Sequence, residues 1–205
     1  NIFPISKRLF IIFNCCTIND LYNKISWVIE MQIINTIVSK TFKMEQYLNY
    51  LACFIDIETT GLSRTYNYIY LIGILYYNSS KNTWVITQLL ADNKDDEKAV
   101  LLEFIKFIDI YDKIITFNGN TFDIPFINER IKMLNINYEI IMDKSFDIYK
   151  IIKENRYYLG LDSLKLKSLE KHLGIYRDDI YTGKDCITFY RDYVKSRDSD
   201  LKKRI

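Results

Sequence analysis

The sequence has few of the residues on which soft-metal centres and extracellular folds depend. It contains one histidine and four cysteines among 205 residues. Cys15, Cys16, Cys53 and Cys186 lack both the paired spacing of a zinc site and the framework of a small secreted domain. We therefore expect reduced thiols and a cytoplasmic location.

Long apolar runs are also absent. A membrane-spanning helix needs roughly 18 consecutive apolar residues. The most suggestive stretch, RLFIIFNCC at residues 8–16, is too short and begins with a charge. We expect no membrane partner.

Charge is nearly balanced overall but unevenly distributed along the chain. The formal net charge is +2. Residues 51–143 carry eight Lys/Arg against thirteen Asp/Glu, a net of −5, whereas residues 144–205 carry fifteen against ten, a net of +5. An acidic half beside a basic half is typical of a metal site next to a polyanion track. Solvated helix faces are an equally good explanation of the basic half.

The chain divides near residue 50. Residues 1–50 show helical spacing without recognisable chemistry, and we interpret them as an N-terminal helical extension. Beyond them, apolar stretches at 51–58, 68–78 and 83–91 predict three antiparallel strands with short connections. We expect residues 51–205 to form one domain, truncated at its C-terminus.

Alternating elements follow these three strands. The pattern predicts a helix over 95–111, a strand over 113–117, a helix from Asp123 to about Leu134, and helices over 161–174 and 183–196. Three meandering strands followed by alternating helix and strand indicate an α/β domain with a mixed sheet.

Two acids close the first strand, in the stretch CFIDIETTGL. Asp56 and Glu58 are two residues apart, so their side chains project from the same face of the strand. Like charges side by side repel each other unless a cation lies between them or one acid stays protonated. Oxygen-rich clusters suit Mg²⁺ or Mn²⁺. The alternative is that the strand simply ends here, with both acids in solvent.

A third acid follows the later strand, in ITFNGNTFDIPFI. Asp123 comes after a polar loop and stands at a predicted helix start, where the helix dipole favours a carboxylate. The alternative role for Asp123 is an ordinary helix N-cap.

Together, DIETTGL and NGNTFD resemble the first two motifs of the DEDD exonuclease superfamily. The resemblance is to the YprB-type ribonuclease H-like exonuclease domain, and it extends through YIYLIG, LDSLKLKSLEKHLGIYRDDIYTG and KDCITFYRDYVK. It covers about residues 51–205. It implies a ribonuclease H-like fold with a mixed five-stranded sheet, in which three antiparallel strands precede the parallel ones, flanked by helices.

The resemblance also implies a chemistry and a set of metal ligands. Two divalent ions, Mg²⁺ or Mn²⁺, would bracket a scissile phosphate at the 3′ end of single-stranded DNA or RNA. Asp56 would bridge both ions, Glu58 would bind one, and Asp123 would bind the other or its waters.

Substrate contacts are implied by the same motifs. Thr60, Gly61 and Leu62 would lie against the terminal nucleotide. Asn118 and Asn120 would orient Asp123 or contact the substrate.

The third motif of the family, a fourth carboxylate with a Tyr or His, is ambiguous in this sequence. YTGKD offers Tyr181 and Asp185 at the spacing of one superfamily branch. We prefer to interpret Asp185 as a first-turn residue of a connecting helix and expect the motif after residue 205. His172 matches no catalytic motif and is interpreted as a helix-end residue, and Asp147 as a helix-capping residue with a supporting role as the alternative.

Three functions are consistent with these features. The first is a metal-dependent 3′–5′ exonuclease, which Asp56, Glu58 and Asp123 favour. The second is a nucleic-acid-binding module that does not cut, which the missing third motif favours. The third is a structure-selective endonuclease on the same fold.

Overall fold

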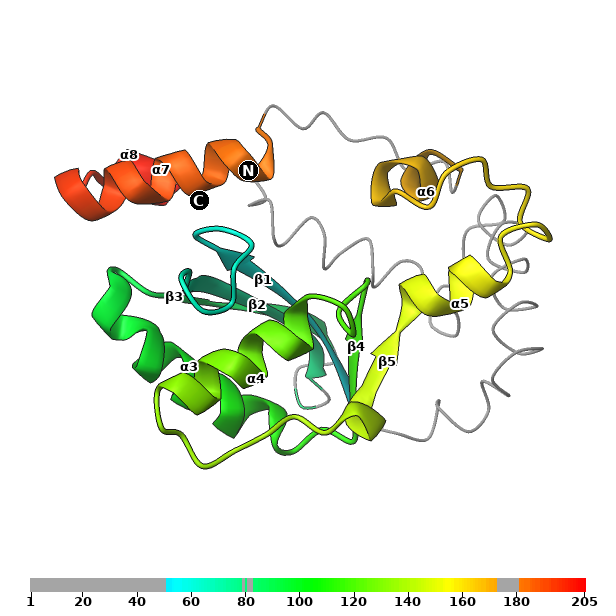
Figure 1. The fold of residues 1–205 in the computed structure, drawn as a ribbon, viewed down its shortest axis with the longest axis horizontal. Helices are drawn as coiled ribbons and strands as arrows, with labels where there is room; N and C mark the ends of the chain where they lie inside the picture. The colour runs from blue at the N-terminus through cyan, green and yellow to red at the C-terminus, as the bar shows by residue number, and fades with distance from the viewer. Residues whose placement is uncertain (1–50, 79, 81–82, 173–180) are drawn as a thin grey trace.

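The computed structural model describes residues 51–78, 80, 83–172 and 181–205 (Figure 1). The extension predicted over residues 1–50 and the helix end predicted at Gly174 lie outside these ranges.

A five-stranded mixed sheet forms the centre of the domain. Its strands are β1 (Ala52–Thr59), β2 (Ile69–Asn78), β3 (Thr83–Leu90), β4 (Lys113–Thr116) and β5 (Ser145–Asp147). The strand order is β3-β2-β1-β4-β5, with β1 in the middle. β1 pairs antiparallel with β2, which pairs antiparallel with β3, whereas β1, β4 and β5 run parallel. The predicted α/β class and mixed sheet are confirmed, although no strand was predicted at β5.

Helices follow the strands in the order that the sequence pattern indicated. They are α3 (Glu97–Ile108), α4 (Asp123–Met133), α5 (Ile148–Glu154), α6 (Leu166–His172), α7 (Gly183–Ser196) and α8 (Ser199–Lys202), with short 3₁₀ helices η3 (Lys94–Asp96) and η4 (Met142–Lys144). α7 has the predicted bounds, whereas α6 begins five residues later than expected. In the part of the chain described here, every helix is too short or too polar to cross a bilayer.

One face of the sheet is covered by α3 and α4 (Figure 1). The odd-numbered residues of β1 point toward these helices, because side chains alternate along a strand. The buried members of this cluster include Ile55 and Ile57 from β1, Leu101 and Phe104 from α3, and Ile127 from α4. This face holds one continuous apolar core.

The opposite face is packed in two separate places. Phe54 and Leu75 form a cluster with residues of α5 and α6, including Ile151 and Leu169. Leu71 and other residues near the start of β2 form a second cluster with α7 and the chain end. Asp56 and Glu58 of β1 therefore lie on the face that carries these two separate clusters.

Candidate active site

Asp56 and Glu58 lie near the carboxyl end of the central strand. They share the face of β1 that carries Phe54, and they stand opposite Gly73 and Leu71 of β2. Gly73 has no side chain, so nothing projects from β2 directly beside Asp56. Glu58 is buried and Asp56 is half-buried. The strand register thus confirms the prediction that both acids lie on one face of β1.

Asp123, the first residue of α4, reaches this strand through a hydrogen bond. The Ile57 N–H donates to Asp123 Oδ1 over 3.2 Å in a buried setting. The pairing of β4 with β1 extends only to Phe54 and Ile115, so β1 runs beyond its parallel neighbour. Asp123 therefore contacts the one backbone position that lies between Asp56 and Glu58.

The loop before α4 has a tightly constrained backbone. Asn118 has φ of 64°, in the left-handed region that few side chains adopt. A Cβ on Gly119 would stand 2.4 Å from the side chain of Thr116, so only glycine fits against that strand end. The Asn118 carbonyl accepts from Phe122 N–H, and the Gly119 carbonyl accepts from Ile124 N–H. These bonds fix the first turn of α4 on both sides of Asp123.

Asp147 holds the same loop from the neighbouring strand. Its Oδ1 accepts from Asn118 N–H over 2.7 Å and its Oδ2 from Asn120 N–H over 3.1 Å. Oδ1 also accepts from Tyr149 N–H, which caps α5 as predicted. The side chain of Asn120 accepts from the Ser145 hydroxyl on β5. The loop is therefore bound to β5 through both its backbone and a side chain.

The turn after β1 is closed at its base and open at its tip. Thr60 and Tyr68 exchange two hydrogen bonds, one of them to the Thr60 hydroxyl. A Cβ on Gly61 would meet the Asn67 side chain at 2.7 Å. Leu62 has 84% of its surface exposed. Of the three residues predicted to contact a nucleotide, Leu62 is thus the one whose side chain is open to solvent.

A buried ion pair between α3 and α4 is hydrogen-bonded to the turn after β1. Arg130 Nη2 lies 2.6 Å from Glu97 Oε2, with both side chains almost fully buried. Glu97 Oε1 also accepts from Ile69 N–H, at the start of β2. Arg130 Nη1 reaches the Arg64 carbonyl over 3.4 Å, and Arg64 in turn donates to the Thr121 carbonyl over 2.8 Å. The turn after β1 and the loop before α4 are therefore connected.

α7 packs beside the turn through stacked tyrosines. The Tyr190 ring stacks on Tyr70 with centroids 4.2 Å apart, and its hydroxyl lies 3.4 Å from that of Tyr68. Burial raises the pKa of Tyr190, so its hydroxyl stays protonated. Arg191 Nη2 donates to the Thr60 carbonyl over 3.2 Å. This places a guanidinium beside the first motif.

The candidate residues for a third motif lie on or near helix ends. Asp185 is in the first turn of α7, as predicted, and its Oδ2 accepts from both Thr182 N–H and the Thr182 hydroxyl. The backbone bond from Thr182, with the hydroxyl bond, lowers the pKa of Asp185. Tyr181 packs edge-on against Phe189 of the same helix. His172 is exposed at the end of α6, as expected for a helix-end residue.

The three acids are chemically suited to a hard divalent cation. Asp56, Glu58 and Asp123 offer only carboxylate oxygens, the ligands that Mg²⁺ and Mn²⁺ prefer. Among residues 51–172 and 181–205, setting aside the few positions not described, no three His, Cys, Asp or Glu side chains are gathered closely enough to hold a metal ion. The chemistry of these donor atoms thus fits such an ion, although the three carboxylates do not lie close enough to one another to form a complete binding site.

The sequence patterns did not identify Arg64, Arg191 or the Glu97–Arg130 pair. Each acts through a backbone carbonyl or through a partner at least 33 residues away. The only available signal was that Arg130 lies seven residues after Asp123, which is two turns along the same side of α4.

Comparison with known proteins gives one family and two related folds. The profile of the RNase_H superfamily matches residues 53–205. The family B DNA polymerase of Pyrobaculum calidifontis has a similar structure, with a TM-score of 0.55 and 16% identity, over 75% of this chain and 22% of that one. The zinc-bound complex of E. coli ExoI with single-stranded DNA has a TM-score of 0.51 and 14% identity, over 73% of this chain and 41% of that one. At these identities the two structures show the fold alone.

A shorter match exists to a curated protein. DNA polymerase 1 of Aeropyrum pernix is 36% identical over 45 residues, which are 22% of this chain and 5% of that polymerase. The chain therefore spans only a small part of the polymerases that it matches. The family profile, by contrast, covers most of the chain and every strand from Cys53 onward. Together with the strand order, it shows that this chain belongs to the RNase_H superfamily.

Proposed function

We propose that residues 51–205 form the catalytic domain of a metal-dependent 3′–5′ exonuclease of the DEDD superfamily, of the YprB type. One observation carries the proposal: Asp123 Oδ1 accepts from the Ile57 N–H, between the two acids of the first motif. Asp123 is thereby bound to the strand end that carries Glu58, an acid 65 residues earlier in the chain.

Asp56, Glu58 and Asp123 would hold two divalent ions, Mg²⁺ or Mn²⁺. When bound, such ions activate a water and stabilise the leaving oxygen of a phosphodiester. The chain's own part is to fix the acids: β1 sets Asp56 and Glu58 on one face, and the loop before α4 sets Asp123 against Ile57.

The substrate would be the 3′ end of a single strand of DNA or RNA. Leu62 is exposed on the turn after β1 and would pack against the terminal base. Arg191, bound to the Thr60 carbonyl, would bring a positive charge to the phosphates. The single-stranded DNA in the ExoI complex, on a similar fold, supports this choice of substrate.

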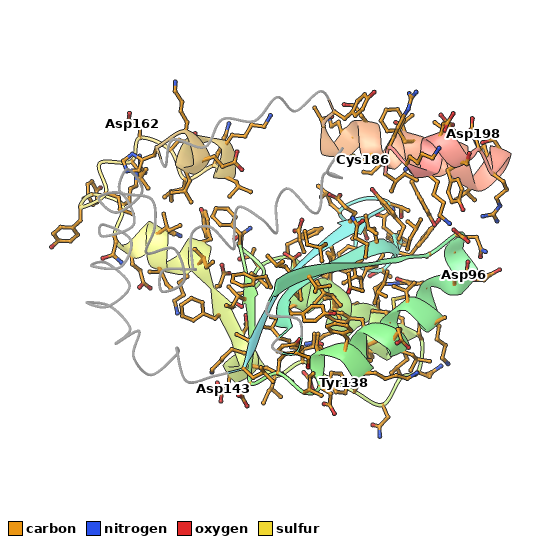
Figure 2. The ribbon with its side chains drawn as sticks, turned by 180° about the vertical axis from the view of Figure 1, so that it is seen from behind. Asp96, Tyr138, Asp143, Asp162, Cys186 and Asp198 are labelled. Carbon is orange, nitrogen blue, oxygen red and sulfur yellow. The ribbon has the colours of Figure 1, made fainter. Side chains whose placement is uncertain are left out.

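The test is hydrolysis of a 5′-labelled single-stranded oligonucleotide with Mg²⁺ or Mn²⁺. Asp56→Asn keeps the size of the side chain but removes the charge, and we expect it to abolish hydrolysis while the thermal transition stays in place. Asp143→Asn is the matched control, because Asp143 is exposed in η4, before β5, at the end of the sheet away from α7 (Figure 2).

The products discriminate among the possibilities. Stepwise shortening from the 3′ end supports an exonuclease, and internal cuts support an endonuclease. Wild-type rates in Asp56→Asn would show that the site is assigned wrongly.

A second candidate is a nucleic-acid-binding module that does not cut. It is favoured by Asp185, whose carboxylate is engaged by Thr182 in the cap of α7 instead of standing open for a metal. Tight binding of single strands without any turnover, in the presence of either metal ion, would favour this module over the exonuclease.

A further inference from the structure

Asp147 is a buried carboxylate outside the proposed ligand set, with 7% of its surface exposed. A carboxylate buried this deeply is costly unless its oxygens are well hydrogen-bonded. Three backbone N–H groups meet this need: those of Asn118, Asn120 and Tyr149. Capping α5 requires only the last of them, so two of the three bonds serve the loop before α4.

The loop that Asp147 holds has a constrained backbone. Asn118 has a φ of 64°, in the left-handed region, which asparagine adopts more readily than most side chains but which the surrounding structure must still support. Gly119 lies so close to Thr116 that the loop has little room to shift toward the sheet. Asp147 Oδ1 accepts from the N–H before Gly119, that of Asn118, and Oδ2 accepts from the N–H after it, that of Asn120. The carboxylate thus holds the loop on both sides of its tightest point.

Hydrogen bonds and short stretches of backbone link this carboxylate to the residues on either side of Asp123. Asp147 accepts from the amides of Asn118 and Asn120. The carbonyl of Asn118 accepts from Phe122 N–H and that of Gly119 from Ile124 N–H, on either side of Asp123. Asp123 itself accepts from Ile57 N–H on β1. Loosening the loop by a substitution at Asp147 is therefore expected to weaken the hydrogen bond from Ile57 N–H to Asp123.

We infer that Asp147 is a positioning residue: by fixing the Asn118–Asn120 loop through its two carboxylate oxygens, it sets Asp123 against β1. The inference rests on the proposed function for its catalytic meaning, but its structural part can be tested without catalysis.

Asp147→Asn separates the loop bonds from the helix cap. If the amide oxygen takes the place of Oδ1, it keeps the bonds to Asn118 and Tyr149. The amide NH₂ then faces the Asn120 N–H. Both groups are donors, so the bond to Asn120 is lost. The opposite orientation would break two bonds instead of one and is disfavoured. Asp147→Ala removes the cap as well.

Asp198→Ala is the matched control for Asp147→Ala and shows what the loss of a helix cap alone does. Asp198 is the N-cap of α8 and accepts from Asp200 N–H, so its loss removes a cap of the same kind. It lies at the outer end of α7 and α8, far from β5 (Figure 2).

The primary measurement is amide hydrogen exchange by NMR on the full 205-residue chain. In Asp147→Asn we expect the Asn120 amide to exchange about tenfold faster, because it has lost its acceptor. The Ile57 amide should exchange faster too, and both should be unchanged in Asp198→Ala. If Ile57 keeps its wild-type exchange while Asn120 loosens, Asp147 holds the loop but does not position Asp123, and the inference is overturned. An unchanged Asn120 amide overturns it as well.

Kinetics add the catalytic part. Displacing a metal-binding acid lowers kcat, by about 10²-fold for a shift near 1 Å, with KM nearly unchanged. A rise in KM alone in Asp147→Asn would contradict a positioning role. If the wild-type chain cuts nothing, the proposed function fails, whereas the exchange experiment still decides whether Asp147 positions Asp123.

Discussion

α3 and α4 cover one face of the sheet with a single continuous core, whereas α5–α6 and α7–α8 cover the other face in two separate clusters. Asp56 and Glu58 project from the second face, between the residues that build those clusters. The continuous face has little tolerance for change, because interiors are packed as densely as organic crystals. On the divided face Glu58 is buried and Asp56 is half-buried. One face thus holds a single core, and the other carries two of the candidate acids between separate clusters.

The largest expected effect comes from the buried charge on the continuous face. Glu97→Ala leaves the Arg130 guanidinium buried without its partner, which costs about 3–5 kcal/mol of the free energy of unfolding. Urea unfolding measures this cost directly. Glu103→Ala is the control, since Glu103 lies on the same helix in an exposed pair with Lys106 and should change stability by less than about 0.5 kcal/mol.

If Glu97→Ala proves too unstable to measure, Glu97→Gln retains acceptor oxygen for Arg130 and should cost less. A Glu97→Ala variant no less stable than Glu103→Ala would mean that the buried pair adds nothing to this face.

Matched leucines compare the two faces directly. Leu101 in α3 and Leu169 in α6 are both buried, at 0% and 2% exposure. Leu101→Ala should cost about 3–4 kcal/mol, because the continuous core collapses little into the cavity, and Leu169→Ala about 2–3 kcal/mol. Chemical unfolding of both variants measures the difference. Equal costs would show that the divided face is packed as rigidly as the continuous one.

The sequence predicted the elements that have strong periodicity. β1, β2 and α7 were found because each has a long run of uniform pattern and clear end signals. β5 was missed because it has only three residues and passes directly into α5, so its strand pattern is too short to separate from the helix. The strand alternation also placed Asp56 and Glu58 on one face correctly.

The parts of the site that sequence patterns missed depend on backbone groups or on partners far away in the chain. Asp147 was predicted as a helix cap, but its bonds to amides 27 and 29 residues away were not, because an amide N–H has no residue-specific signature. Glu97 and Arg130 are 33 residues apart, and only the packing of α3 beside α4 shows that they pair. Such contacts follow from the tertiary fold and not from local spacing.

Two glycines extend the comparison to the backbone. Gly119 packs against Thr116 at the end of β4, and an added Cβ would stand 2.4 Å from that side chain. Gly119→Ala should therefore cost about 1–3 kcal/mol. Gly183, in the first turn of α7, has nothing within 4 Å of an added Cβ, so Gly183→Ala should be neutral or stabilising by up to about 1 kcal/mol. Thermal unfolding of the two variants makes the measurement, and a harmless Gly119→Ala would argue against a tight strand end.

The smallest expected effect concerns the docking of α7 and α8 on the divided face. Asp92 accepts from Lys202 Nζ over 2.8 Å and from the Tyr193 hydroxyl over 2.6 Å. The hydrogen bond from Lys202, followed by that from Tyr193, lowers the pKa of Asp92 below its usual value. A lowered folded-state pKa means that the stabilisation is present above the unfolded pKa of about 3.9 and is lost as the pH falls through the folded value. The Asp92 side chain is 47% exposed, so solvent screening keeps the effect below about 1 kcal/mol.

Comparing wild type with Asp92→Asn in urea at pH 6 and pH 3 tests this docking contact. The stability difference should be present at pH 6 and smaller at pH 3, which is below the unfolded pKa of about 3.9, because the stabilisation is lost progressively as the pH falls toward the folded value. Added salt should reduce the difference at pH 6, because the Asp92–Lys202 pair is exposed. A difference that stays constant with both pH and salt would mean that Asp92 acts through neutral hydrogen bonds alone. The ion pair would then contribute nothing to holding α7 and α8 on the divided face.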